Sequence, residues 1–340
     1  MQRAVSQVTN MNSNILITGG CGYIGSHIAL LLKKQGFKII VIDNLSTGHR
    51  DNMLEEVIYE IGDIADNNFL AAVFNRHPVD IVMHLAAKTS VEESIQHPEL
   101  YYEENLLNSI NLIKVCGQQA VKHFIFSSTA AVYGETTQPT VHENQNLYPM
   151  HPYGKSKYIT ELALSHFAQQ YAMQLTILRY FNVAGHDQSL RVGNFNRKSG
   201  ALIPLICRHI ALNKFSITVN GNDFDTPDGT CVRDYIHVMD IANAHSMAIT
   251  CFYSSTQQKN LILNVGYGKG LSILELIQLI NSLSDLPLCY TIGNRRNGDI
   301  PYSVADNTLI KSLAWTSLFQ NPYKEIILSE IAWNKKLYKI

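Results

Sequence analysis

A tyrosine and a lysine, Tyr153 and Lys157, lie four residues apart in the segment HPYGKSKY. The stretch YGKSKYITELALSHFAQQY has helical periodicity, so both side chains project from one face of a helix. An unperturbed phenol keeps its proton to about pH 10, but a neighbouring ammonium favours the phenolate and lowers the phenol's pKa. The pair is therefore either solvated surface of a helix or a general base with the cation that activates it.

Hydroxyl side chains end the predicted strand that precedes this helix. The apolar run HFIFSST finishes with Ser127, Ser128 and Thr129. Doubly wound sheets bind ligands at the carboxyl ends of their strands, and this strand end lies there. We therefore expect Thr129 and Tyr153 to converge at one sheet edge, which favours the catalytic interpretation of the pair.

A glycine-rich turn follows the first predicted strand in NILITGGCGYIGSH. Gly19, Gly22 and Gly25 allow backbone N–H groups to approach a pyrophosphate, and the following helix N-terminus adds a favourable dipole. A glycine triplet alone is weak support, but here the flanking strand and helix supply the required context. The second strand ends at Asp43, whose carboxylate can accept both ribose hydroxyls of NAD and would repel the 2′-phosphate of NADP. We therefore predict NAD as the cofactor.

Short apolar runs alternate with helical stretches through the first half of the chain. The runs are NILITGG, KIIVIDN, DIVMHLAA, HFIFSST and LTILRYFNV. Near-continuous apolar strands separated by helices indicate a parallel sheet that is covered on both faces. The predicted fold class is therefore α/β, a doubly wound parallel sheet of the Rossmann type with a smaller C-terminal α/β substrate lobe.

The strand–helix rhythm breaks after about residue 185, where GHDQSLRVGNFNRKSG is polar and contains glycine. We predict a flexible N-terminal extension at 1–13, an NAD-binding domain at 14–185 and a substrate lobe at 186–340. The boundary is soft, because such chains can cross back into the first domain.

Composition excludes several classes of protein. The 340 residues contain 27 Lys and Arg against 28 Asp and Glu, so no basic stripe points to nucleic acid. No apolar run reaches the roughly 18 residues of a membrane helix, and the start lacks the apolar core of a secretory signal. The six scattered cysteines have no metal-binding spacing, which predicts reduced thiols, no metal and a cytoplasmic protein.

Several motifs occur together: TGGCGYIGSH, IDNLSTG, FSSTAAVYG, YGKSK, LRYFN and DGTCVRDYIHVMD. As a set they resemble the extended short-chain dehydrogenase/reductase family and, within it, the UDP-glucose (UDP-galactose) 4-epimerases, from about Asn14 to the C-terminus. The resemblance implies that NAD stays bound while Tyr153 takes the proton of the sugar 4-hydroxyl and hydride leaves C4. The 4-keto sugar then turns over and receives the hydride on its other face. Lys157 would bind the nicotinamide ribose and tune Tyr153, and Thr129 would hydrogen-bond the sugar oxygen.

The resemblance also assigns binding residues and a partner. It implies NAD contacts at Gly19, Gly22, Tyr23, Ile24, Gly25, Asp43, Asn44, Asp63, Ile64, Ala86, Ala87, Asn105, Tyr153, Lys157 and Tyr180. It implies UDP-sugar contacts at Thr89, Thr129, Tyr153, Asn182, Ala201, Leu202, Asn220, Arg233, Arg296, Asp299 and Ser303. It further implies a homodimer formed through the helix that carries Tyr153.

Three positions depart from the pattern of the glucose-specific members. Thr89 replaces a lysine, Ala201 replaces Asn or His, and Ser303 stands where a bulky tyrosine can close the C2 side of the sugar. A one-residue slip in the alignment would put Tyr302 there instead. Small side chains at 201 and 303 would leave space for an acetamido group, so we hypothesise that UDP-GlcNAc and UDP-GalNAc are also substrates.

Other functions on the same fold remain as alternatives. Nucleotide-sugar dehydratases need an acid and a base directly after the threonine, where this chain has Ala130 and Ala131. A UDP-glucuronate decarboxylase and a sugar-nucleotide reductase share the other features and stay open. A non-catalytic NAD-binding sensor would be expected to lose the tyrosine, the lysine or the hydroxyl, and all three are present.

Overall fold

The computed structural model describes residues 13–136, 138–197, 200–254, 260–283, 287–296 and 298–340. The predicted extension at 1–13 therefore lies outside the described residues, apart from Ser13. Among the described helices, none is long and apolar enough to cross a bilayer.

The largest element is a parallel sheet of seven strands in the order β10-β6-β5-β4-β1-β2-β3. Its strands are β1 (Asn14–Thr18), β2 (Lys38–Asp43), β3 (Ile58–Ile61), β4 (Ile81–His84), β5 (His123–Thr129), β6 (Gln174–Tyr180) and β10 (Leu261–Val265). The order reverses at β1, as in doubly wound dinucleotide-binding folds. The predicted fold class is confirmed.

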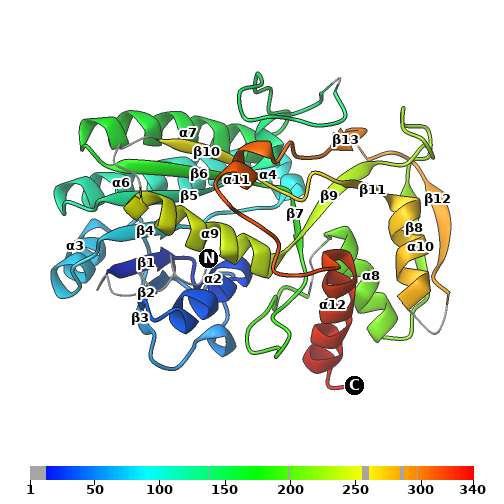
Figure 1. Ribbon diagram of the computed structural model, residues 1–340, viewed down its shortest axis with the longest axis horizontal. Helices are drawn as coiled ribbons and strands as arrows, with labels where there is room; N and C mark the ends of the chain where they lie inside the picture. Colours follow the sequence, from blue (N-terminus) through cyan, green and yellow to red (C-terminus); the bar gives the residue numbers. More distant parts are fainter. Residues whose placement is uncertain (1–12, 137, 198–199, 255–259, 284–286, 297) are drawn as a thin grey trace.

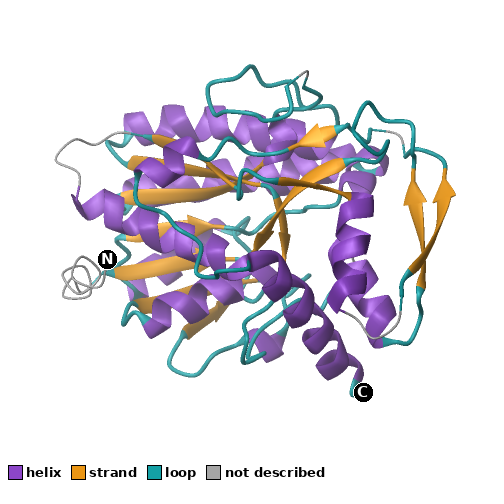
Figure 2. Ribbon diagram, turned by 45° about the vertical axis from the view of Figure 1, so that its right-hand side comes forward, coloured by secondary structure: helices purple, strands orange, loops and turns teal. Residues whose placement is uncertain are grey.

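Helices cover both faces of this sheet, as Figures 1 and 2 show. On one face α2 (Tyr23–Lys34) and α9 (Val238–Ser254) share a buried core with Ile15 and Ile17 of β1. On the other face α3 (Asn67–Arg76), α6 (Asn108–Gln118) and α7 (Pro152–Gln170) pack with Leu16. Alternate residues of β1 thus enter opposite cores, which explains why its sequence is apolar at nearly every position.

Short helical elements line the chain between these layers. They are η1 (Arg50–Asn52), α4 (Val91–Gln96), α5 (Pro98–Tyr102), the π-helix η2 (Glu103–Leu107) and η3 (Ala130–Val132). The last three lie against α7, the helix that carries Tyr153 and Lys157.

A second group of elements lies beyond the carboxyl edge of the large sheet. A small sheet contains β7 (Asn182–Ala184), β9 (Val232–His237), β11 (Gly270–Ser272) and β13 (Tyr302–Ser303), and β8 (Ser216–Asn220) pairs with β12 (Cys289–Gly293). The helices of this part are α8 (Leu202–Ala211), α10 (Ile273–Leu283), α11 (Thr308–Ser312) and α12 (Pro322–Tyr338). Figure 2 shows the two-stranded ladder at the side of the molecule, remote from the large sheet. The division at residue 185 stays a prediction; β10 comes late in the chain and lies in the large sheet.

Candidate active site

The glycine-rich turn joins β1 to α2 at the carboxyl edge of the sheet. Gly19 has φ +71°, and a Cβ on Gly25 would lie 2.3 Å from the carbonyl oxygen of Gly19. Gly22 is the N-cap residue of α2, and no side chain caps this helix. The N–H groups of the first turn, which includes Tyr23 and Ile24, are thus the donors a helix leaves unpaired at its start. A tight, side-chain-free turn with such donors fits the pyrophosphate of a dinucleotide.

Asp43 organises the loop after β2. Its carboxylate accepts the backbone N–H of Cys21 at 2.9 Å and that of Leu45 at 2.8 Å, and the side chain is buried. A Cβ on Gly48 would come within 2.6 Å of Asp43 Oδ1, so the loop closes directly over this carboxylate. Each oxygen keeps a lone pair for a further donor. The turn-forming role of Asp43 is thus observed, and its contact with a ribose stays a prediction.

The remaining predicted cofactor residues gather at the same edge, because all seven strands are parallel. Asn44 follows β2 and donates to Asp63, which with Ile64 follows β3. The Tyr23 hydroxyl donates a hydrogen bond to the carbonyl of Gly185. The ring therefore points toward the second group of elements, and only the backbone of Tyr23 lies in the glycine-rich turn. Tyr180 is the last residue of β6, and its hydroxyl forms hydrogen bonds with Ser127 and His245.

Asn105 holds the loop after β4, where Ala86 and Ala87 lie. Its amide pairs with the backbone of Lys88 twice, accepting from N–H at 2.8 Å and donating to C=O at 3.0 Å. Asn105 is buried in the π-helix, an element that often marks functional sites. Asn105 therefore holds the loop after β4 in place, and its predicted contact with the cofactor stays a prediction.

Thr129, Tyr153 and Lys157 converge as the spacing predicts. Thr129 lies close enough to Tyr153 to act on the phenol and oppose the rise in its pKa. Lys157 is only 3% exposed, and its ammonium donates to the carbonyl of Ser127 at 2.9 Å. The three side chains come from the end of β5 and the first two turns of α7, so they form one site beside the β4 loop.

The prediction that the Lys157 ammonium and a positive nicotinamide ring together lower the pKa of Tyr153 stays a prediction, and the surrounding protein adds an opposing effect. Burial raises the pKa of the Tyr153 phenol, and the Thr129 side chain opposes that rise. Burial also lowers the pKa of Lys157 to about 7, with Glu161 opposing it. Near neutral pH the lysine is only partly charged, so the protein alone does not make Tyr153 a phenolate.

The predicted substrate residues lie on the second group of elements and on one loop of the first. Arg233 on β9 pairs in register with Ser303 on β13, so these two positions are neighbours. Arg296 donates to Asp299 at 3.0 Å; the arginine side chain is exposed, and the aspartate side chain is partly buried. Of the others, Asn182 begins β7, Asn220 ends β8, Ala201 and Leu202 begin α8, and Thr89 is exposed after β4.

A buried network behind the site did not emerge from the sequence. Arg179 on β6 forms a two-pronged ion pair with Glu161, at 3.1 and 2.7 Å, and Ser128 also donates to Glu161. Glu161 lies one turn after Lys157 on α7, and that spacing is the one signal that could have suggested it. His84 is another buried residue that sequence patterns did not indicate. Its ring nitrogens form hydrogen bonds with Thr18 and Ser109, each at 2.7 Å, which link β1, β4 and α6 below the loop.

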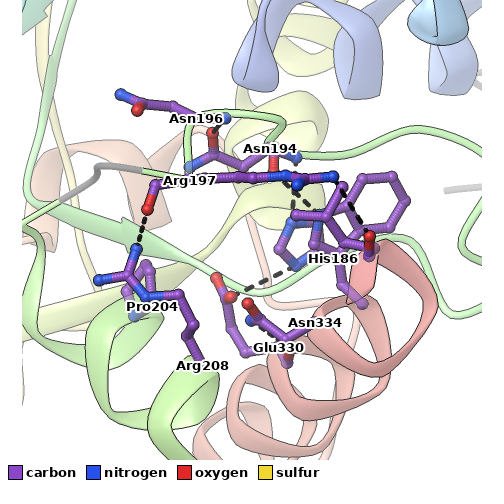
Figure 3. A pocket seen from close by; sticks show the side chains of 10 residues that line it. His186, Asn194, Asn196, Arg197, Pro204, Arg208, Glu330 and Asn334 are labelled. Carbon is purple, nitrogen blue, oxygen red and sulfur yellow. Dashed lines mark hydrogen bonds and ion pairs between the residues drawn. The ribbon is translucent and has the colours of Figure 1, made fainter. Parts of the chain in front are cut away.

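A separate small pocket lies between α8, α12 and the loop before α8 (Figure 3). Its volume of ≈ 20 Å³ suits about one water molecule and excludes a nucleotide sugar. Inside it, Nδ1 of His186 faces Glu330 at 3.6 Å. This pocket is therefore not the candidate active site.

The fold and the site together define a dinucleotide-binding enzyme with a tyrosine side chain beside the cofactor edge of its sheet. Comparison with known proteins gives the same class. Residues 15–266 match the NAD dependent epimerase/dehydratase family, so the chain belongs to that family.

Individual relatives cover nearly the whole chain. A UDP-glucose 4-epimerase from Halalkalibacterium halodurans is 38% identical over 321 residues, which are 94% of each chain. The crystal structure of UDP-glucose 4-epimerase from Brucella ovis in complex with NAD is 35% identical, with a TM-score of 0.88 over 95% of this chain and 98% of that one. The UDP-Glc/GlcNAc 4-epimerase from Campylobacter jejuni is 36% identical, with a TM-score of 0.82 over 95% and 99%.

Proposed function

We propose that the protein interconverts UDP-glucose and UDP-galactose by inverting carbon 4 of the sugar through a 4-keto intermediate, with NAD held tightly throughout. The observation that carries this proposal is the convergence of Tyr153, Thr129 and Lys157 beside a glycine turn that fits a dinucleotide. The relatives named above support it, because they are UDP-glucose 4-epimerases and one of them was crystallised with NAD.

The residues of the chain would divide the proton chemistry among them. Tyr153 exchanges a proton with the oxygen on sugar carbon 4, and Thr129, which lies close to Tyr153, holds the same oxygen. The hydrogen bond from Lys157 to the carbonyl of Ser127 holds α7 against the end of β5. In its protonated form Lys157 also places a positive charge in the site. When bound, NAD supplies the reversible two-electron oxidant for the sugar carbon. The burial of Lys157 and the half-burial of Tyr153 keep water away from the proton exchange.

The cofactor would lie along the carboxyl edge of β1 to β6. We assign the pyrophosphate to the turn Gly19–Gly25, the adenosine to Asp43, Asn44, Asp63 and Ile64, and the nicotinamide half to Ala86, Ala87, Asn105, Lys157 and Tyr180. The conformation of Gly19 and the close approach at Gly25 support this placement, since side chains there would fill the turn.

The UDP-sugar would lie between the two groups of elements. Arg233 and Arg296 suit its diphosphate, because a guanidinium forms paired, charge-assisted hydrogen bonds with phosphate. Asp299, Asn182, Asn220 and Leu202 complete the nucleotide side in this assignment. Thr89, Ala201 and Ser303 would face the sugar, and the last two leave room for an acetamido group, so N-acetylated UDP-hexoses are proposed as further substrates. The Campylobacter jejuni relative, a UDP-Glc/GlcNAc 4-epimerase, supports this extension.

The alternatives named for this fold gain no support. In the described residues η3 places Ala130 and Ala131 directly after Thr129, and neither side chain can transfer a proton. A dehydratase would need an acid and a base at those positions.

A homodimer through α7 and a cytoplasmic location are also proposed. Ile159 and Leu162 share the exposed face of α7 at 39% and 47% exposure, and Leu107 on the neighbouring η2 is 57% exposed. An apolar stripe of this kind suits a second copy of the same helix. All six cysteines are free thiols, which suits a reducing compartment.

The activity is tested by incubating the purified protein with UDP-galactose and no added NAD. We expect UDP-glucose to form until the two sugars reach equilibrium, because the cofactor is reused. A parallel sample with UDP-GalNAc tests the broader specificity, with UDP-GlcNAc as the expected product. Absence of any UDP-glucose from a preparation shown to contain NAD would contradict the proposed function. Turnover of the plain sugar alone would reject the acetylated substrates.

A further inference from the structure

A histidine, His151, caps the start of the helix that carries Tyr153. His151 has an extended backbone, and its Nδ1 accepts the backbone N–H of Gly154 at 3.2 Å. Its imidazole also stacks on the Tyr153 ring, with centroids 6.0 Å apart and planes 5° apart. Helices usually begin with Ser, Thr, Asp or Asn, and none of these titrates close to neutral pH. At the start of α7, by contrast, the capping residue is a histidine, whose ring titrates close to neutral pH and also contacts the proposed base, Tyr153.

The first turn of α7 lies directly on the segment that holds Thr129. A Cβ on Gly154 would lie 2.7 Å from the carbonyl oxygen of Ala131, so the two backbones are in close contact. Ala131 in turn donates its N–H to Oγ1 of Thr129 at 3.1 Å. A displacement of this turn would therefore move Tyr153 relative to Thr129.

We propose that His151 is a positioning residue that couples Tyr153 to pH: neutral His151 holds the first turn of α7 and the Tyr153 ring in place, and protonated His151 releases them. This inference rests on the proposed function for the role of Tyr153. An acceptor at Nδ1 requires a neutral imidazole with its hydrogen on Nε2. Protonation places an N–H on Nδ1 against the N–H of Gly154, which removes the cap and brings two donors together.

The charged surroundings set the pH range of this change. Burial lowers the pKa of His151, and the cation of Lys155, one turn further on, lowers it again. The positive end of the α7 dipole acts in the same direction. On the other side of Tyr153, the ring of Tyr101 makes an edge contact, and its hydroxyl donates to the carboxylate of Glu93 on α4. His151 is therefore neutral at pH 7, and the cap is lost only as the pH falls through the pKa of the folded protein, which lies below the ordinary histidine value of about 6.5.

The experiment compares His151→Asn with the wild-type holoenzyme across pH. Asparagine accepts the same hydrogen bond at a helix start but does not titrate. As the pH falls, kcat for UDP-galactose should decrease more for the wild type than for His151→Asn. The ratio of the two kcat values should change about fivefold between about pH 8 and pH 5.5, which corresponds to the loss of a typical helix cap. KM should change little, because the proposed UDP contacts lie on other elements.

His97→Asn is the matched control. His97 also begins a helix, α5, but its side chain makes no cap hydrogen bond, so this variant should follow the wild-type pH profile. His151→Phe keeps a ring without an acceptor, so its kcat should be below that of the wild type at about pH 8 and should approach the wild-type value toward acid, where the wild type loses the same cap. Superimposable acid limbs for the wild type and His151→Asn would overturn the proposal.

Thermal unfolding tests the cap without reference to activity. The wild type should lose stability relative to His151→Asn as the pH falls below about 6.5, because the unfolded chain binds the proton more readily. A Tm difference that is constant from about pH 8 to pH 5.5 would also overturn the proposal. If no form of the protein turned over UDP-galactose, the proposed function would fail, and this measurement would still decide whether His151 is a pH-dependent cap.

Discussion

At the scale of single residues, the site contains a lysine whose burial lowers the stability of the folded protein. Lys157 is 3% exposed, and its ammonium has one hydrogen-bond acceptor, the Ser127 carbonyl, in the described residues. Burial lowers its pKa to about 7 from the usual 10.5. The unfolded chain therefore binds a proton that the folded chain gives up between these two values. The resulting destabilisation is full below about pH 7 and fades as the pH rises toward 10.5.

Lys157→Met should accordingly stabilise the fold while it removes activity. The free energy of unfolding should rise by roughly 2–4 kcal/mol at neutral pH, and the gain should shrink toward pH 10, because methionine has no charge to desolvate. Urea unfolding of both proteins at equal NAD content and several pH values measures this. A variant less stable than the wild type at pH 7 would show that the charge of Lys157 contributes to stability.

Local patterns in the sequence were sufficient to predict the convergence of Thr129, Tyr153 and Lys157. The helical spacing places the last two on one face, and parallel strands bring their carboxyl ends to one edge. The same patterns could not reveal the Glu161–Arg179 pair, which depends on how α7 lies across β6. They also could not reveal that burial raises the pKa of the Tyr153 phenol, because desolvation depends on packing that no local motif encodes.

At the scale of elements, the glycine turn is the feature with the least freedom to change. The sequence predicted its strand–turn–helix context, and the structure shows why Gly25 is required: a Cβ there would meet the Gly19 carbonyl at 2.3 Å. The strand β10 illustrates what sequence patterns leave out. Its run LILNV is typical of a buried strand, but nothing local indicates that it returns to the first sheet beside β6.

Gly25→Ala should lose bound NAD, because the added methyl group forces the turn away from its present path. Gly200→Ala is the matched control, since a Cβ there meets nothing within 4 Å. NAD per chain, measured after gel filtration and acid release, should fall at least about tenfold in the first variant and stay unchanged in the second. Equal NAD content in both would contradict the placement of the pyrophosphate.

At the scale of the whole molecule, the two groups of elements are joined around the predicted cofactor edge. Asn52 is buried and pairs with the Gly193 backbone in both directions, at 2.9 and 2.8 Å, while also donating to the Cys21 carbonyl in the glycine turn. His49 stacks on Phe195 with centroids 4.0 Å apart. The loop over Asp43 is thus fastened to the second group, which suits a cofactor that remains bound through many turnovers.

The proposed dimer is tested by placing a charge on the exposed face of α7. Ile159→Arg should convert the dimer to a monomer, because a buried unpaired guanidinium in an apolar helix interface costs several kcal/mol. Leu328→Arg on α12 is the matched control, since both side chains are 39% exposed. Molar mass from light scattering should halve only for Ile159→Arg. A wild-type monomer, or a dimer unaffected by this change, would contradict the assignment of the interface.

The most direct test of the whole account is the turnover number of Tyr153→Phe with saturating UDP-galactose, measured on protein shown to carry the same NAD content as the wild type. The phenylalanine ring keeps the contacts with His151 and Tyr101 but has no oxygen to exchange a proton. We predict a loss in kcat of at least about 10²–10⁴-fold, the usual contribution of a general acid–base group. A variant that still epimerises UDP-galactose within a few fold of the wild-type rate would contradict the assignment of Tyr153 as the base.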